Sequence, residues 1–313
     1  MTEPLRPFYF NVVVWGKRFR DYFLDLCLPS LLSPGNIPAL ENKAGSKFLI
    51  ATTRDDWDAM RTTAIWRRLE SQIEPVLLEI PYPAPGVSGC QHMGVGHILA
   101  TERAFQDRAY FLALTPDLFV SDGSIETVQR HARDGKSIVL VAALRFAEEP
   151  LMEELLRRGL FDPARPPQST GEVLVLPPRA MTAMALRSLH SEGRGYVWDE
   201  PFGATLLPLC LWPVGRGEGM IVHSFSWAPF LLDYGVVREH DTSALQNWTF
   251  DGDYVHKNFA GTGSIHVVED SDEIMMVSWS PLAYQAASTR PRLGWRSPTI
   301  RRFLKSSILE ATY

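Results

Sequence analysis

Residues 110–144 read YFLALTPDLFVSDGSIETVQRHARDGKSIVLVAAL and contain one complete strand–helix–strand unit. The apolar run Tyr110–Leu114 predicts a buried strand, and Thr115–Gly123 predicts the turn that follows it. Ser124 is expected to cap an amphipathic helix, and Lys136–Leu144 predicts a second strand that is buried on both faces. A helix between two such strands is typical of a parallel sheet with right-handed crossovers.

The same alternation of strands and helices precedes this unit. Strands are predicted at the apolar runs Phe8–Trp15, Lys47–Thr52 and Val76–Ile80. Thr53 and Asp56 resemble a capping box, in which hydroxyl and carboxylate satisfy the free N–H groups of a helix start. After residue 160 the pattern changes to strand-like runs without long helices between them: Thr205–Trp212, Met220–Phe225, Ile265–Val268 and Ile274–Ser278.

We therefore predict an α/β fold class, with a Rossmann-like, mostly parallel sheet, helices on both faces, and a mixed or antiparallel C-terminal half. Residues 1–160 are expected to form the α/β region. Residues 161–289 are expected to form a mixed α/β region continuous with the same sheet, and residues 290–313 a basic C-terminal helix or tail.

The composition is that of a globular protein large enough for a substantial core. The 313 residues are 45% hydrophobic and 21% charged, and the formal net charge is -5. An acidic chain gains nothing from a polyanion, so no general affinity for nucleic acid is expected. Because we find neither a secretory signal, nor an apolar run of membrane-spanning length, nor cysteines at metal-ligand spacing, the sequence predicts a cytoplasmic protein.

Acidic side chains follow several predicted strands, at the edge where open α/β sheets bind their ligands. Asp117 stands three residues past the strand Tyr110–Leu114, and Asp122 lies in the turn before the next helix. Two carboxylates near a strand end can hold a divalent cation that neutralises a diphosphate. The alternative is structural, with a turn acid at Asp117 and a helix cap at Asp122.

Two patches in the second half combine polar and aromatic groups. His223 begins the segment HSFSWAP near a strand end, and the acids Asp251 and Asp253 lie between Trp248 and Tyr254. Aromatic faces beside acids suit a sugar, because the rings stack on its C–H groups while the carboxylates accept its hydroxyl hydrogens. A hairpin turn at the Asp-Gly pair is the alternative.

Two further segments carry weaker signals. Gly94 and Gly96 are expected to open a helix, whose free N–H groups could take a phosphate. The acidic loop Asp270–Glu273 follows a strand that carries His266. We predict a solvated turn there.

Taken together, residues 8–145 resemble the GT-A-type nucleotide-sugar glycosyltransferases. The likeness lies in the order of the strand FNVVVW, the strand KFLIATT with its capped helix, and the run ILATERAFQDRAYFLALTPDLFVSDGSIETVQRHARDGKSIVLV. In that family the acidic turn after the fourth strand usually carries an Asp-x-Asp element that binds a divalent metal and the donor diphosphate. Here Thr115-Pro116-Asp117 stands at the matching position and keeps only the last acid.

The resemblance implies transfer of a sugar from a nucleotide-diphosphate donor, bound by residues 1–160, to a carbohydrate or lipid-linked glycan acceptor on the side of residues 161–289. It also implies a divalent metal, Mn²⁺ or Mg²⁺. The residues that it assigns are Asp117 and Asp122 for donor and metal, His223 for the metal, Thr52, Thr53 and Arg54 for the nucleotide, and Asp251 or Asp253 for the acceptor, one of them as its base.

Two other function classes stay open. A nucleotidyltransferase shares the sheet and the acids, but it would usually offer a glycine-rich first loop, and Trp15–Arg20 contains one glycine. A catalytically silent carbohydrate-binding or scaffold protein would explain the missing acid at Thr115. The basic tail, residues 290–313, predicts either a helix packed on the domain or a peripheral contact with the inner membrane face, where a lipid-linked acceptor would reside.

Overall fold

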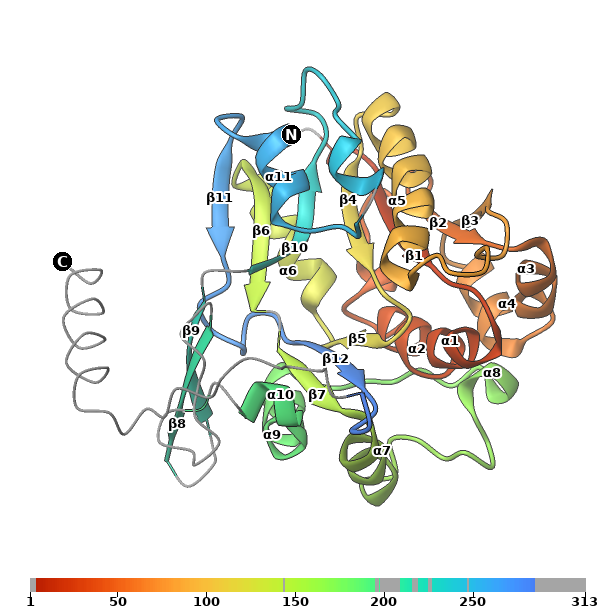
Figure 1. Cartoon of the computed structure of the whole chain (residues 1–313), viewed down its shortest axis with the longest axis vertical. Coiled ribbons are helices and arrows are strands. Elements are labelled where there is room, and N and C mark those ends of the chain that lie inside the picture. Colours follow the sequence, from red (N-terminus) through yellow and green to blue (C-terminus); the bar gives the residue numbers. More distant parts are fainter. Residues whose placement is uncertain are drawn as a thin grey trace.

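A computed structural model describes residues 4–142, 144–194, 197, 209–215, 219–224, 227–246 and 248–284. Its centre is a seven-stranded sheet (Figure 1). In spatial order its strands are β11 (Ser264–Val267), β6 (Lys136–Ala142), β10 (Trp227–Asp233), β4 (Tyr110–Leu114), β1 (Phe8–Val13), β2 (Lys47–Thr52) and β3 (Glu74–Glu79). Only β10 runs against its two neighbours, and the other strands all point the same way. The predicted α/β class with a mostly parallel sheet is therefore confirmed.

Alternating side chains along the strands build a separate core on each face of the sheet. On one face Phe10 and Phe48 belong to the larger core. The helices that contribute to it are η1 (Phe23–Cys27), α2 (Leu28–Leu31), α3 (Arg54–Arg61), α4 (Ala64–Glu70) and α6 (Ser124–Arg133). On the other face Tyr9, Leu49 and Phe111 pack with α5 (Gly89–Gln106), η4 (Ser243–Gln246) and α11 (Gly252–Phe259).

A three-stranded sheet lies beyond the carboxyl ends of β4 and β6 (Figure 1). A short connection leads from β4 into β5 (Leu118–Val120), and another leads from β6 into β7 (Arg145–Ala147). The late strand β12 (Met276–Ser280) pairs between them, antiparallel to β5 and parallel to β7. The carboxyl edge of the large sheet is therefore enclosed by a second sheet rather than open to solvent along its whole length.

The remaining elements surround this second sheet or complete the connections. They are α1 (Lys17–Tyr22), η2 (Ile37–Ala39), α7 (Glu148–Arg157), α8 (Pro167–Thr170), α9 (Pro178–Ala185), η3 (Leu186–Ser188), α10 (Ser191–Arg194) and the antiparallel pair β8 (Leu209–Val214) and β9 (Gly219–Ser224). None of the helices in the described ranges is both long and apolar enough to cross a membrane. The predicted basic tail, residues 290–313, lies outside the described residues.

Two local predictions are wrong, and one alternative is excluded. The helix expected to open at Gly94 begins at Gly89, because the Ser88 hydroxyl accepts the Gln91 N–H at 3.2 Å and caps it there. At the start of α6 the capping position is held by Gly123 with φ 86°, not by a serine side chain. The hairpin turn that was the alternative at Asp251 is excluded, because this residue caps the helix α11.

Candidate functional site

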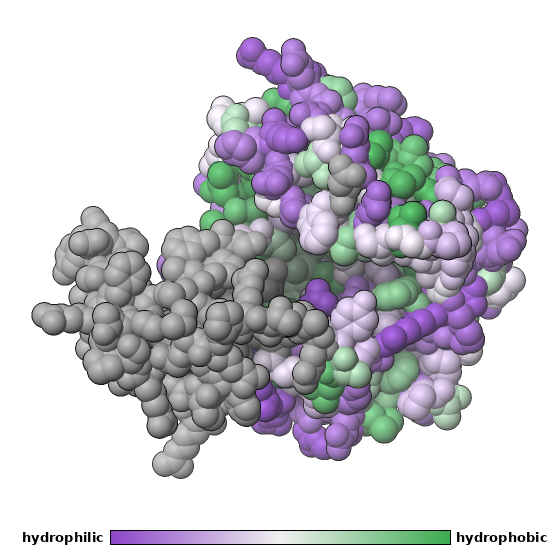
Figure 2. Space-filling view, viewed as in Figure 1, coloured by the Kyte–Doolittle hydropathy of each residue, from purple (hydrophilic) through white to green (hydrophobic). Residues whose placement is uncertain are grey.

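The loops after β1 and β4 lie next to each other at the carboxyl edge of the large sheet. From β1 the chain continues to β2 and β3 on one side, whereas β4 pairs with β1 on the other side, so the strand order reverses between β1 and β4. In open α/β sheets such a reversal leaves a crevice in which ligands bind. Figure 2 shows a hollow on this face of the molecule, near the level where β4 ends.

Asp117 is the predicted acid that the structure places at this crevice, between β4 and β5. Its backbone carbonyl accepts the N–H of Trp279 at 3.2 Å. Burial raises the pKa of its carboxyl group, whereas a hydrogen bond with Thr115 and the charge of Arg145 act in the opposite direction. A carboxyl group whose pKa is shifted by burial and by a specific charged neighbour, beside a crevice, is typical of a functional site.

Arg145 supplies positive charge at the same place. It begins β7, is exposed, and lies close enough to Asp117 to lower the pKa of that carboxyl group. Its guanidinium has no hydrogen-bond or ion-pair partner among the residues that the structure describes. An exposed guanidinium with unused N–H donors can bind phosphate oxygens in a bidentate manner. Arg145 is not among the residues selected from the sequence, although it stands three residues after the end of β6, as Asp117 does after the end of β4.

A second network joins α1 to the start of α7 beside this site. The Arg18 guanidinium donates to the Tyr22 hydroxyl at 2.8 Å and to the Glu148 carboxylate at 2.9 Å. The Tyr22 hydroxyl also donates to the same carboxylate. Burial, followed by the bond to Glu148, raises the pKa of Tyr22 to about 12, so its hydroxyl stays protonated. Through these bonds the segment after β1 is held against the segment after β7.

The predicted nucleotide contacts Thr52, Thr53 and Arg54 lie at the end of β2 and directly after it. Thr53 and Arg54 already have partners within the protein, and Thr52 is buried. The Thr53 hydroxyl caps α3 by accepting the N–H of Asp56 at 3.2 Å, as the capping-box interpretation requires. The Thr52 hydroxyl is buried and has no hydrogen-bond partner within the described ranges. Arg54 forms an ion pair of 2.5 Å with Glu79. Contact of these three residues with a nucleotide therefore stays a prediction.

The other two predicted metal ligands are not placed beside Asp117. The Asp122 carboxylate accepts the backbone N–H of Gly35 at 2.7 Å, past the far end of β5. An extended strand rises about 3.3 Å per residue, so β5 puts on the order of 10 Å between the two acids. His223 lies on β9, opposite Cys210 of β8.

The predicted acceptor acids lie at the start of α11, on the face of the large sheet that α5 also covers. The Asp251 carboxylate caps this helix by accepting the N–H of Asp253 at 3.1 Å, whereas Asp253 itself is exposed. Of the flanking aromatic residues, Trp248 is exposed but Tyr254 is buried, and its hydroxyl bonds with His240 at 2.7 Å. The expected pair of sugar-stacking rings is therefore reduced to one.

A cavity of about 700 Å³ opens at the carboxyl end of β6. Its walls come from the end of β6, from α9, from β9 and from residues 268–276, and Arg179 and Asp272 form an ion pair of 2.9 Å among its lining residues. Cavities of this volume are typical of small-molecule sites. The acidic loop Asp270–Glu273 is an exposed turn, as predicted, in which the Glu273 N–H donates to the Asp270 carbonyl at 3.0 Å, and Asp270 and Asp272 also line this cavity.

Comparison with known proteins finds matches among solved structures only. No family model matches the chain, and no curated protein matches it. Among solved structures, Staphylococcus aureus TarS, a glycosyltransferase, is 12% identical with a TM-score of 0.29, over 46% of this chain and 23% of TarS. A putative glucose-1-phosphate thymidylyltransferase from Bacillus anthracis, in complex with a sucrose, is 10% identical with a TM-score of 0.27, over 46% of this chain and 57% of that protein. The chain thus matches less than two thirds of either protein, and similarity this low does not identify a function.

Proposed function

We propose that this protein is a glycosyltransferase that moves a sugar from a nucleotide-diphosphate donor to a carbohydrate acceptor. The observation that carries the proposal is the crevice at the reversal of strand order, where Asp117 and Arg145 lie together. A diphosphate needs positive charge and hydrogen-bond donors, and the exposed guanidinium of Arg145 offers both. The neighbouring acid gives the site a group that can position a sugar hydroxyl.

The described residues at the crevice do not fit a metal centre built by the protein alone. Mg²⁺ is usually held by one or two carboxylates together with substrate phosphates, whereas a site built by the protein alone needs several oxygen ligands that converge on one ion. No group of three or more ligand side chains in the described part of the chain includes Asp117, and Asp122 is bonded to Gly35 instead. We propose instead that arginines compensate the charge of the donor diphosphate: chiefly Arg145, supported by the half-exposed Arg18, which Glu148 holds at 2.9 Å.

The acceptor is proposed to enter from the side of the cavity at the end of β6. Leu144 lines that cavity, and Arg145 is the next residue along the chain, so the cavity and the proposed diphosphate site adjoin. Its volume of about 700 Å³ is enough for one or more sugar units. Asp253 lies at the start of α11, on the face of the sheet that α5 covers, and does not line this cavity, so its contact with an acceptor stays a separate prediction from the sequence.

The proposal is tested by thermal unfolding of the full chain with UDP, GDP, CMP and dTDP, each with and without Mn²⁺. One nucleotide should raise the unfolding temperature without Mn²⁺, because a ligand at a hundredfold excess over its Kd stabilises the native state by about 2.7 kcal/mol. Arg145→Gln should lose most of this shift. Arg61→Gln, a change at another exposed arginine at the end of α3, should keep it.

The outcomes separate the function classes. No shift with any of the four nucleotides would contradict the proposal and favour a carbohydrate-binding protein. A shift that requires Mn²⁺ would contradict the assignment of the diphosphate charge to arginines alone. In a turnover assay with sugar nucleotides, release of the nucleoside diphosphate supports glycosyl transfer, whereas release of pyrophosphate from a nucleoside triphosphate would favour a nucleotidyltransferase.

A further inference from the structure

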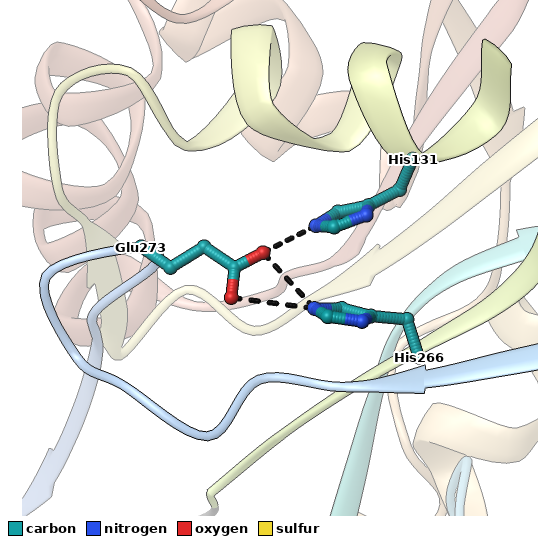
Figure 3. A group of neighbouring side chains, drawn as sticks. All are labelled: His131, His266 and Glu273. Atoms are coloured by element: carbon teal, nitrogen blue, oxygen red, sulfur yellow. Dashed lines mark hydrogen bonds and ion pairs between the residues drawn. The ribbon is translucent and has the colours of Figure 1, made fainter. Parts of the chain in front are cut away.

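Three side chains from three separate elements meet at the edge of the large sheet. His131 lies in the last turn of α6, His266 on the edge strand β11, and Glu273 in the connection between β11 and β12 (Figure 3). They lie at the edge of the sheet formed by β11, next to β6. No part of the proposed transfer chemistry uses them.

The two imidazole rings stack and direct the same nitrogen toward one carboxylate. Their centroids are 3.9 Å apart with 27° between the ring planes. The Nε2 atom of His266 lies 3.0 Å and 3.3 Å from the two carboxylate oxygens of Glu273, and the Nε2 atom of His131 bonds to the first of these oxygens. Figure 3 shows both rings pointing at the carboxylate from the same side.

These distances suit a small metal ion. The three ligand atoms lie within 4.8 Å of one another. In a tetrahedral zinc site, with Zn–N and Zn–O bonds of about 2.0–2.1 Å, neighbouring ligand atoms are about 3.3 Å apart. The separations of 3.0 Å and 3.3 Å between the His266 Nε2 atom and the Glu273 oxygens come close to that value, and rotation of the hydrogen-bonded His131 ring would admit an ion. Both rings would then offer the Nε2 lone pair and keep their proton on Nδ1.

The chemical types of the three ligand side chains indicate which class of metal ion the site would bind. Imidazole nitrogen suits zinc and its neighbours among the transition metals, whereas Mg²⁺ and Ca²⁺ prefer sites made only of oxygen. The side chains are 15%, 26% and 25% exposed for His131, His266 and Glu273, so an ion can reach them from solvent. A water molecule can complete a four-coordinate site with three protein ligands.

From this geometry we propose that His131, His266 and Glu273 bind a divalent cation of the zinc class. The ion fastens the loop after β11 to the end of α6. Glu273 faces α6, while its neighbours Asp272 and Ile274 line the cavity at the end of β6. Metal binding therefore stiffens one wall of that cavity. This inference does not depend on the proposed function.

The test uses the full chain without an affinity tag, freed of metal with a chelator and titrated calorimetrically with ZnCl₂. One Zn²⁺ per chain is expected, and MgCl₂ should show no comparable binding. His131→Gln and His266→Gln should each weaken Zn²⁺ binding by at least about tenfold, since even outer-shell changes cost 10–100-fold in metal affinity. His256→Gln, on the exposed side of α11, should bind Zn²⁺ as the unaltered chain does.

A second measurement needs no variant. Co²⁺ added to the unaltered chain should give the strong visible absorption of a four-coordinate site, and Zn²⁺ should displace it at one equivalent. The absence of stoichiometric Zn²⁺ binding by the unaltered chain would overturn the proposal. So would a loss of binding in His256→Gln that equals the loss in His131→Gln. Circular dichroism of each variant before metal addition distinguishes lost ligands from lost folding.

Discussion

The carboxylate of Asp56 accepts the backbone N–H of Gly16 at 2.8 Å and so joins the loop after β1 to the first turn of α3. Its other oxygen accepts the Arg20 guanidinium at 2.7 Å. Asp56 is only 6% exposed, so water cannot replace these partners easily. One acid therefore fixes the position of the loop that forms one side of the crevice.

Replacing this acid should destabilise the protein strongly. Asp56→Ala removes the partner of a backbone N–H and of a partly buried guanidinium, and breaking such a buried pair costs about 3 kcal/mol of unfolding free energy. Urea denaturation measures the change. Asp55→Ala, at the exposed neighbouring position, should cost less than about 1 kcal/mol. Equal costs for the two variants would mean that the Asp56 contacts add nothing.

The order of the first-half elements could be predicted from the sequence, but β10 could not. Strands such as Lys47–Thr52 and Tyr110–Leu114 are continuous apolar runs between clear turn signals, and the structure confirms their bounds. The strand Trp227–Asp233 contains Pro229, a residue that rarely fits the middle of a sheet. The structure accommodates it at an irregularity, because the register against β6 shifts between Pro229 and Leu231. Such a bulge depends on partner strands that the local sequence does not reveal.

The stability effect of Asp117→Asn should depend on pH. Burial raises the pKa of the Asp117 carboxyl above its ordinary value of 3.8, so its protonated form is favoured in the folded state. The stability that this preference contributes is complete below the ordinary value and is lost as the pH rises through the raised pKa. Because the variant's amide cannot ionise, its unfolding free energy relative to the unaltered chain should increase from pH 4 to pH 7.

Urea denaturation at several pH values measures this difference. Asp58→Asn, at an exposed position of α3, serves as the control and should show no such trend. If Asp117→Asn instead became relatively less stable toward pH 7, the folded protein would favour the ionised carboxylate, with Arg145 as the closest described cation. The pKa of Asp117 would then be lowered by folding rather than raised.

His97 should make the protein sensitive to mild acid. It is fully buried, and burial lowers the pKa of its ring to about 4. The amide group of Asn11 donates to the Leu49 carbonyl at 3.0 Å, which leaves its oxygen to accept the Nδ1–H of His97 at 3.0 Å. A lowered pKa contributes stability above the ordinary value of 6.5, and this is lost as the pH falls toward 4.

Over that interval the loss should amount to about 3 kcal/mol, at 1.36 kcal/mol for each unit of pKa shift. Unfolding free energies measured between pH 7 and pH 4.5 test the slope. His97→Gln should flatten it whatever its overall cost, and His256→Gln should leave it unchanged, since His256 is exposed. An unchanged slope in His97→Gln would assign the acid sensitivity to another group.

Gly96 should not tolerate alanine, although alanine favours helices. A Cβ atom at Gly96 would lie 2.6 Å from the Ala51 side chain and 2.7 Å from that of Val13, so α5 could not stay seated on β1 and β2. Overpacking of this kind costs about 1–3 kcal/mol, more than the roughly 1 kcal/mol that helix propensity returns. Gly89→Ala, with open space around the site, should be neutral or stabilising. Thermal unfolding of both variants shows whether the cost of overpacking exceeds the gain in helix propensity.

The candidate site could be predicted only in part, because its residues come from strands whose pairing the local sequence does not reveal. Asp117 follows a strand whose apolar run ends at a clear turn signal, so its place at the sheet edge could be predicted. The partnership with Arg145 depends on β7 lying near β4, which the pairing of both β5 and β7 with the late strand β12 brings about. The glycine pair Gly94 and Gly96 was misleading, because a helix that packs closely requires small residues just as a phosphate loop does: Gly96 packs on β1 and β2, and Gly94 on the carbonyls of Leu245 and Trp248.

The reversed strand β10 has a consequence for how the chain is made. β6 ends at Ala142, but the strand that separates it from β4 begins only at Trp227. While the ribosome is still adding the residues between them, β4 and β6 each present an unpaired apolar edge, and such edges invite pairing with other chains. We therefore expect residues 1–160 not to fold stably on their own. A fragment cut at residue 160 should aggregate, and the nascent chain should depend on chaperones until Asp233 has emerged from the exit tunnel.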